Sequence, residues 1–384
     1  MARRVFFHIG LPKTGTTYLQ TIMWHNRDKL RGQGMLLPGS ERRDHLWSSL
    51  VVREDPGVAR RNRKAPTSWA RLTDEIGAWP GDAVISHEFF ASASAAQAQR
   101  AIDTLAPAEV HVVGTGREPL GLFTASWQEY VKSKGTMPLS EYGWTTSEDP
   151  RAVWDWRALD IGLVLDRWSS AVPPENVHVL TLPKPGSPKE LLWQRFAILL
   201  GLDPDAFDLS ASFPNESMGV AETEALRRIN GVLVGFGTAV DRGVWIRSYL
   251  ADERLVPRGG EKYWPDEAQI QMCRRRGADA VTLIRQRGFD VIGDVNDLLV
   301  PEKLPERRHP SSVTDGEVAQ VAVETIAAML ADVRRLTHDL RSTERKLARV
   351  RSRRRGPVSA WFQPRQLVRG SPVLTRLYRK VRRI

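Results

Sequence analysis

The segment 10–17, GLPKTGTT, carries groups that bind phosphate or a similar oxyanion. Its two glycines, with four residues between them, allow a tight turn and a close approach of the backbone to a ligand. Thr16 and Thr17 add hydroxyl donors, and Lys13 adds a positive charge. A Walker A loop has its lysine directly after the second glycine, where this chain has Thr16. The pattern therefore weakens the case for a nucleoside triphosphatase (NTPase).

The loop needs a strand before it and a helix after it if its N–H groups are to converge on one anion. Val5–Ile9 is an apolar run typical of a buried parallel strand, and a helix is expected over Tyr18–Leu30. Strands alternate with helices further along, which predicts an α/β fold whose parallel sheet is covered by helices on both faces. Further strands are expected at 83–86, 110–115 and 177–182, and further helices near 91–105, from 119, at 187–201 and at 222–233.

Polar residues follow two of these strands. His87 and Glu88 come directly after the second expected strand, and Arg117 comes after the third, with Thr124 and Ser126 in the helix that follows. Ligands of open parallel sheets bind outside the carboxyl ends of the strands. We therefore expect His87 and Glu88 to lie at the rim of a binding site.

The segment GLPKTGTTYLQ resembles the 5′-phosphosulfate-binding loop of the sulfotransferases that use 3′-phosphoadenosine 5′-phosphosulfate (PAPS). The family pattern is Pro-Lys-x-Gly-Thr-[Thr/Ser] after the first strand. In that family an Arg at the end of a later strand and a Ser in the next helix hold the 3′-phosphate, and HVVGTGREPLGLFTASWQEYVK has this form. The family Ser usually comes eight residues after the Arg, where this chain has Ala125, so Ser126 and Thr124 are alternatives. The residues that match, with Thr14 at the variable position, are Pro12, Lys13, Thr14, Gly15, Thr16, Thr17, Arg117 and Ser126.

The resemblance covers roughly residues 5–300 in the order of elements, and the arrangement is most similar to a bacterial, actinobacterial-type branch. It implies a P-loop-like α/β fold and transfer of a sulfuryl group from PAPS to a hydroxyl or amine, with 3′,5′-adenosine bisphosphate as product. Lys13 would donate to the bridging oxygen, while Thr16 and Thr17 would bind the 5′-phosphate. No metal is expected. The acceptor stays open between a glycan, a glycolipid and a small metabolite.

Members of that family use either a His or a Glu as general base from comparable places. A general base needs a pKa near working pH, which suits a histidine directly and a glutamate after partial desolvation. We favour Glu88, with His87 second. The structural alternative is that Glu88 caps the following helix and that His87 packs at the strand end.

Three weaker features have ordinary structural explanations. Asn215 and Ser217 precede a helix and are expected to mark its entry only. Arg258, followed by two glycines, faintly resembles a late Arg-x-Gly element of the 3′-phosphate site, but a surface turn explains it equally well. Aromatic rings can stack on sugars or lipids, yet they are also common core residues. Four of the 13 tryptophans fall in one stretch: Trp144, Trp154, Trp156 and Trp168.

Composition places the basic character in the tail. The net charge is +11, but residues 334–384 hold 17 Lys and Arg against two acids, a charge of +15, which leaves −4 for residues 1–333. The high pI therefore does not make the main domain a nucleic-acid binder. A single cysteine, Cys273, excludes an intramolecular disulfide, and no apolar run is long enough to span a membrane, so we expect a cytoplasmic chain.

The pattern divides the chain into an α/β domain over 1–305, a linker over 306–316 and a basic helical tail over 317–384. Residues 334–384 could lie on an anionic membrane, which would make the protein peripheral there, or bind an acidic partner such as a polyanionic glycan. A coiled-coil arm and a solvated extension are further alternatives, and RNA binding lacks a recognisable module. Two rival functions remain: an ATP-dependent kinase or NTPase on a P-loop fold, and a non-catalytic nucleotide-binding protein that acts through its basic arm.

Overall fold

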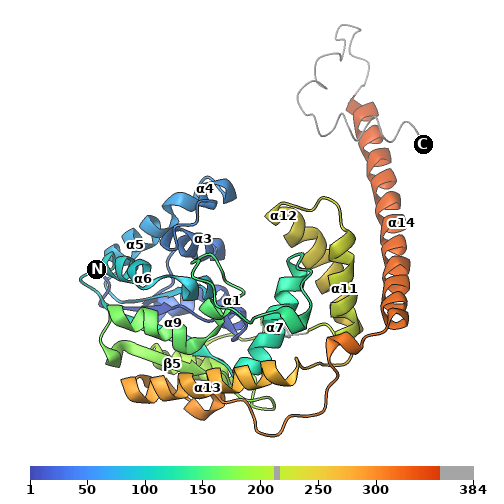
Figure 1. Ribbon diagram of the computed structural model, residues 1–384. Coiled ribbons are helices and arrows are strands. Elements are labelled where there is room, and N and C mark those ends of the chain that lie inside the picture. The colour runs from blue at the N-terminus through green and yellow to red at the C-terminus, as the bar shows by residue number, and fades with distance from the viewer. Residues whose placement is uncertain (212–216, 355–384) are drawn as a thin grey trace. The chain divides into compact units, whose positions relative to one another are not determined.

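A computed structural model describes residues 1–211 and 217–354 of the chain. Contacts divide the protein into two units, Met1–Thr325 and Ile326–Ile384. The first is an α/β unit, and the described part of the second is the continuation of helix α14 (Asp315–Arg354) (Figure 1). Within the described ranges, no helix combines the length and the apolar character needed to cross a membrane.

The α/β unit is built on a six-stranded sheet in the order β2-β3-β1-β4-β5-β6. Every pairing between neighbouring strands is parallel, which confirms the expected fold class. The four expected strands are present, whereas the two edge strands β2 and β6 were not predicted because two or three residues carry no readable pattern. The strands are β1 (Arg4–His8), β2 (Met35–Leu36), β3 (Asp82–Ser86), β4 (Glu109–Gly116), β5 (Val177–Thr181) and β6 (Asp290–Ile292).

Helices cover both faces of the sheet because side chains along each strand alternate between them. Phe6 of β1 packs in one cluster with residues of α1 (Thr16–His25) and α10 (Leu191–Leu199). Its neighbour Phe7 packs on the other face, against Phe90 and Trp168, at ring-centroid distances of 4.8 and 4.9 Å.

The other helices of the unit lie close to where periodicity places them, with a few shifted ends. The helix expected over 18–30 is broken at Asn26, whose side-chain amide donates to the carbonyls of Ile22 and Asp208 and thereby competes with helical bonding. The helix expected from 91 begins at Ala95, behind a capping box of Ser94 and Gln97. The helices are α2 (Arg27–Gly32), α3 (Arg42–Val52), α4 (Val58–Arg61), α5 (Ser68–Ala78), α6 (Ala95–Asp103), α7 (Pro119–Lys132), α8 (Trp156–Leu159), α9 (Ile161–Trp168), α11 (Val220–Val232), α12 (Ala239–Asp241) and α13 (Glu267–Arg287).

The segment 306–316, expected as a linker, is bonded to the α/β unit. Arg308 forms ion pairs with Glu261 at 3.2 Å and with Glu317 at 2.6 Å, and its backbone carbonyl accepts from the N–H of Trp264. Helix α14 begins at Asp315, and the boundary between the two units falls ten residues further on, after Thr325. The second basic segment of the expected tail, 357–384, lies outside the described residues.

Candidate anion-binding cleft

Strand order determines where the site lies. β1 is central: the chain runs from it to β2 and β3 on one side and then crosses to β4 on the other. The direction of winding therefore reverses between β3, β1 and β4, and such switch points form ligand crevices at the carboxyl ends of parallel strands. A cleft of about 770 Å³ lies there, lined by Lys13 after β1, Glu88 after β3 and Arg117 after β4.

The phosphate-loop candidate has the strained backbone that its glycines predicted. Gly10, Lys13 and Gly15 have φ angles of 64°, 66° and 83°, and the hydroxyl of Thr14 closes the loop by donating to the carbonyl of Leu11 at 2.7 Å. A Cβ atom at Gly10 would lie 2.9 Å from Cα of Glu88, so the loop and the end of β3 approach each other closely.

Three expected ligand-binding residues of this loop face the cleft at the start of α1. Gly15, Thr16 and Thr17 line it together with Lys13. The N-terminus of a helix carries unpaired N–H groups and a partial positive charge, so this arrangement suits an anion. Pro12 and Thr14 are buried within the loop and contribute to its shape.

Lys13 has an internal partner that the sequence did not indicate. Its ammonium lies 2.6 Å from a carboxylate oxygen of Glu129, which is buried in α7. The other oxygen of Glu129 pairs with Arg247, from the π-helical segment Arg242–Leu255. Burial raises the pKa of Glu129, but the charges of Lys13 and Arg247 outweigh it, so the pKa lies below its ordinary value. Lys13 and Arg247 both line the cleft, where a bound anion would compete with Glu129 for them.

Glu88 faces the same cleft, and a chain of hydrogen bonds from Gln20 and Arg42 positions its carboxylate. Its carboxylate accepts a hydrogen bond from the side-chain amide of Gln20 at 3.3 Å, and the amide oxygen of Gln20 accepts from Arg42 at 2.8 and 3.1 Å. Burial raises the pKa of Glu88, but His87, Arg42 and Gln20 together hold it below its ordinary value. The expectation of a raised pKa is therefore wrong, and Glu88 is an ionised carboxylate at neutral pH.

His87 has the structural position that was kept as an alternative. It is buried, caps the turn Glu88–Ser92 by accepting from the backbone N–H of Phe89 at 3.1 Å, and is not among the residues that line the cleft. Burial lowers its pKa. The imidazole shapes the end of β3 through this cap.

A second histidine, His8, was not predicted and ties the central strands together under the cleft. Its Nδ1 lies 2.8 Å from the hydroxyl of Ser86 in β3, and its Nε2 lies 2.7 Å from the hydroxyl of Thr115 in β4. Burial lowers its pKa to about 4, so it is neutral at neutral pH. Each contact spans more than 70 residues, which is why spacing in the sequence gave no signal for it.

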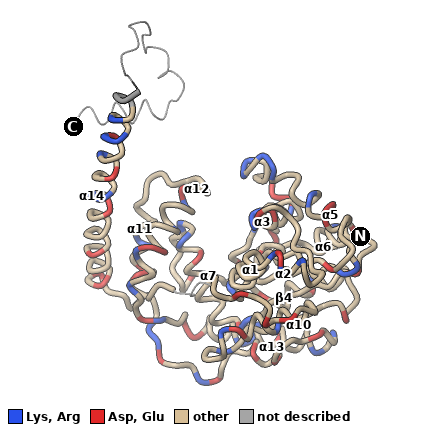
Figure 2. Tube along the Cα trace, turned by 180° about the vertical axis from the view of Figure 1, so that it is seen from behind, with Lys and Arg blue, Asp and Glu red and all other residues tan. Residues whose placement is uncertain are grey.

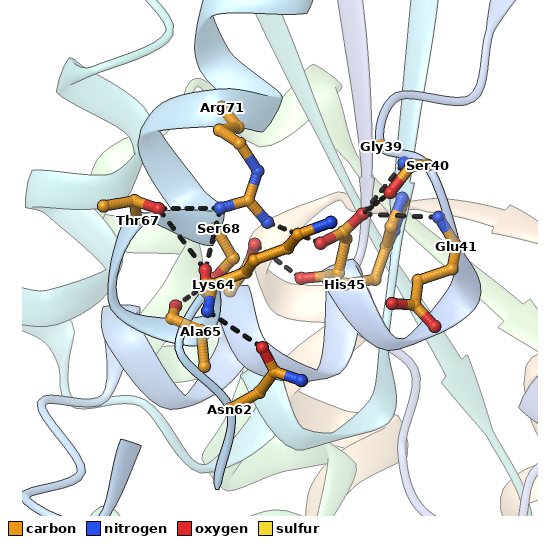
Figure 3. A network of polar contacts seen from close by, with 12 residues as sticks. Gly39, Ser40, Glu41, His45, Asn62, Lys64, Ala65, Thr67, Ser68 and Arg71 are labelled. Carbon is orange, nitrogen blue, oxygen red and sulfur yellow. Dashed lines mark hydrogen bonds and ion pairs between the residues drawn. The ribbon is translucent and has the colours of Figure 1, made fainter. Parts of the chain in front are cut away.

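A polar network holds the helix that supplies Arg42 (Figure 3). Asp44, buried in the first turn of α3, accepts from the backbone N–H of Ser40 at 2.8 Å and pairs with Arg71 of α5 at 2.6 Å. Arg71 also donates to the hydroxyl of Thr67 at 2.7 Å. Because these bonds fix the start of α3, they fix the position from which Arg42 reaches Gln20.

Only some side chains of the second predicted phosphate motif face the cleft. Arg117 and Thr124 line the cleft. Ser126 is buried instead, where its hydroxyl donates to the carbonyl of Phe123 at 2.8 Å and accepts from Tyr142 at 3.1 Å. Of the two hydroxyls that the sequence left open, Thr124 is the one that a ligand in the cleft would meet. Neighbouring Glu118 caps α7 by accepting from the N–H of Gly121.

The cleft is strongly basic. Seven Lys and Arg line it against three acids, Glu88, Glu118 and Asp297. Five of the seven were not singled out from the sequence, because they belong to no phosphate-binding motif. A lining of this charge favours a ligand with several negative charges. The seven are Lys13, Arg117, Lys184, Arg247, Lys262, Lys303 and Arg307.

Two of the four tryptophans in the aromatic stretch belong to the core. Trp156 and Trp168 are fully buried, and Trp144 is exposed. Trp154 lines the cleft and packs edge-on against Phe89 at a centroid distance of 6.2 Å. A fifth tryptophan, Trp264, lines the cleft with the guanidinium of Arg307 over its ring at 3.9 Å, although the sequence gave no reason to select it.

The weaker motifs have mixed outcomes. Ser217 lines the cleft and accepts a hydrogen bond from Lys262 at 2.6 Å, which goes beyond the expected helix entry, whereas Asn215 lies outside the described residues. Arg258 pairs with Glu222 at 3.3 Å and with Glu324, and is not among the lining residues of the cleft. Across residues 1–211 and 217–354, no group of three or more His, Cys, Asp or Glu is arranged to hold a metal ion.

Comparison with known proteins leaves the family open. No protein-family model matches the chain, and no curated protein matches it. Among solved structures, it is similar to a sulfotransferase from Alicyclobacillus acidocaldarius, at 19% identity and a TM-score of 0.38, over 60% of this chain and 93% of that chain. A likeness at this identity and score does not assign the chain to a family.

Proposed function

We propose that the protein is a sulfotransferase that uses PAPS and acts on a hydroxyl or amine. The observation that carries the proposal is that the loop after β1, Arg117 after β4 and Glu88 after β3 line one basic cleft. An anion-binding loop, a second cationic site and a carboxylate are the parts that such a transfer needs in one place.

The cofactor would be held at two points. The 5′-phosphosulfate fits the N-terminus of α1, where Gly15, Thr16 and Thr17 face the cleft. The 3′-phosphate fits Arg117, with Thr124 as the accompanying hydroxyl in preference to the buried Ser126. The surplus of lining cations over acids would offset the charge of a ligand with several anionic groups.

The transfer exchanges one bond to sulfur for another. The bond between sulfur and the bridging phosphate oxygen breaks, a bond from sulfur to the acceptor oxygen or nitrogen forms, and the acceptor proton passes to Glu88. The bisphosphate leaves with the electron pair of the broken bond. Lys13 would donate a hydrogen bond to that leaving oxygen, which requires its ammonium to leave Glu129. Arg247, on the other oxygen of Glu129, would keep this carboxylate partly neutralised after Lys13 has moved.

The acceptor would enter beside Glu88. Trp154 lines the cleft with Glu88 and could pack against the apolar face of a sugar, a lipid or a small metabolite. All three classes of acceptor offer an apolar face to Trp154. The proposal therefore names the type of reaction and the cofactor, and it covers all three classes.

Calorimetric titration with 3′,5′-adenosine bisphosphate tests the proposal directly. Full-length protein should bind the bisphosphate and bind ATP more weakly, with or without Mg²⁺. Arg117→Ala should weaken bisphosphate binding by about 10-fold or more, because a hydrogen bond to a charged group is removed. Arg100→Ala is the matched control: Arg100 is an exposed arginine paired with Glu54 and is not a lining residue, so binding should be unchanged.

Other outcomes point to the rival functions. Binding of Mg·ATP without binding of the bisphosphate would contradict the proposal and support a kinase or NTPase. Bisphosphate binding without transfer from PAPS to any tested acceptor would leave a non-catalytic nucleotide-binding protein as the better description.

A further inference from the structure

Among the described residues, helix α14 carries an exposed apolar seam. Within the second unit, hydrophobic side chains recur in a strict seven-residue repeat over 326–350, at the positions that face a partner in a coiled coil. Seven of the eight seam positions are apolar, and these seven side chains are between 37% and 60% exposed. The seam consists of Ile326, Met329, Val333, Leu336, Leu340, Thr343, Leu347 and Val350.

The spacing of this seam favours another helix over a lipid surface as its partner. A repeat of 3.5 residues keeps a narrow seam facing another helix, whereas a helix that lies on a membrane has a broad apolar face bordered by basic residues. Acidic Asp339 and Glu344, both exposed, border this seam next to its apolar positions. Carboxylates in these places would be repelled by anionic headgroups.

We propose that α14 forms a two-stranded antiparallel coiled coil with α14 of a second copy of the chain. The seam is self-complementary in this orientation: Ile326 would face Val350 of the other copy, and Leu336 would face Leu340. Met329 would likewise face Leu347, and Val333 would face Thr343, so every seam residue has a partner. Helices of this length obtain most of their stability from such packing.

The charges beside the seam select the antiparallel orientation. In a parallel pair, Asp339 would face Glu344 of the other copy at two symmetric positions, and both contacts would be repulsive. In the antiparallel pair, Asp339 faces only its own counterpart in the other copy, so the unfavourable contact between acids occurs once instead of twice. Antiparallel packing also separates the basic C-terminal ends of the two helices, which Figure 2 shows as Lys and Arg gathered toward the end of α14.

The molar mass of the full-length protein in solution, measured by light scattering, is the first test. The intact chain should have twice its monomer mass of 43.2 kDa. Leu336→Glu with Leu340→Glu, which places four carboxylates in the central layers, should return the mass to that of the monomer. The matched control, His338→Glu with Ser342→Glu, puts the same groups on the opposite, exposed face of α14 and should stay dimeric.

Orientation is tested by oxidative crosslinking of cysteine variants. A mixture of Ile326→Cys and Val350→Cys chains should form a covalent dimer, because these positions face each other in the antiparallel pair. Ile326→Cys alone should not, because the two sulfurs would be about 36 Å apart along the helices. Crosslinking of Ile326→Cys alone would overturn the antiparallel assignment.

Three results would overturn dimerisation through α14. They are a monomeric intact chain, a dimer that survives the seam substitutions, and seam-dependent co-sedimentation of a monomer with anionic vesicles. The last would identify a membrane as the partner. Cooperative thermal unfolding of the seam variant, followed by circular dichroism, serves as the check that the α/β unit is folded, so this test and that of the proposed function fail independently.

Discussion

The ammonium of Lys13 lies 2.6 Å from Glu129, so the lysine of the anion-binding loop already has a buried carboxylate as its partner. A ligand that recruits Lys13 must therefore break this ion pair. The same carboxylate holds Arg247, so one acidic side chain controls two cations of the cleft.

Replacing that carboxylate should separate binding from catalysis. Glu129→Gln removes the group that competes for Lys13 and Arg247, so 3′,5′-adenosine bisphosphate should bind several-fold more tightly. Turnover should fall because Glu129 no longer holds the ammonium of Lys13 in position. Titration calorimetry and steady-state kinetics measure the two effects, with exposed Glu175→Gln as the control. Weaker bisphosphate binding in Glu129→Gln would contradict this interpretation.

Removing the proposed base should abolish chemistry and preserve binding. Glu88→Gln keeps the size and polarity of the side chain but cannot take the acceptor proton, so turnover should fall by about 10²- to 10⁴-fold with little change in bisphosphate affinity. His87→Asn should reduce turnover much less, because His87 caps a turn and does not line the cleft. Full activity in both variants would remove this segment from the mechanism.

The bond from Arg42 to Gln20 should be visible in the pH dependence of turnover. Arg42 and Gln20 both lower the pKa of Glu88, so Arg42→Gln should raise it. The acid limb of the rate profile, where Glu88 becomes protonated, should then move to higher pH, while bisphosphate affinity stays constant. Neighbouring Arg43 is exposed, and Arg43→Gln should leave the profile in place. An unshifted limb in Arg42→Gln would show that Arg42 does not act on the base.

Two buried histidines should make the protein sensitive to mild acid. The pKa values of His8 and His45 are lowered from 6.5 to about 4, with burial as the largest cause in both. Between these values the unfolded chain binds protons that the folded chain does not, so stability is fully present above about pH 6.5 and is lost as the pH falls toward about 4. Each histidine should contribute a loss of about 2–4 kcal/mol over that range.

Denaturant titrations at several pH values measure this loss. His45→Gln should flatten the dependence of the unfolding free energy on pH, although the variant itself will be less stable, since His45 accepts from the N–H of Ser86. His338→Gln, at an exposed position of α14, is the control and should keep the slope of the intact chain. If the unfolding free energy of His45→Gln depends on pH as steeply as that of the intact chain, His45 does not contribute to the loss of stability in acid.

Local patterns predicted the parts of the site that lie next to one another in the chain. The strand and loop over 5–17 combine an apolar run with glycines, and both signals are short-range. The partners of the loop were out of reach, because Glu129 is 116 residues from Lys13 and packing alone brings them together. The choice between the two hydroxyls of α7 could have been predicted from helical periodicity. Ser126 does not belong to the face of α7 that lines the cleft, whereas Thr124 does. The residues of that face recur every three or four positions: Leu120, Gly121, Thr124, Ala125 and Gln128.

The backbone of Lys13 has a consequence for protein engineering. Its φ of 66° is a conformation that glycine adopts at little cost and that a residue with a Cβ atom adopts at about 1–2 kcal/mol. Glycine at this position would relieve that cost, but it would also remove one of the two cations that compensate the buried carboxylate of Glu129. Removing one partner of a buried ion pair costs about 3–5 kcal/mol, which is more than the backbone strain. The ion pair thus retains a lysine in a conformation that favours glycine, and position 13 should be held fixed in any stabilised version of the protein.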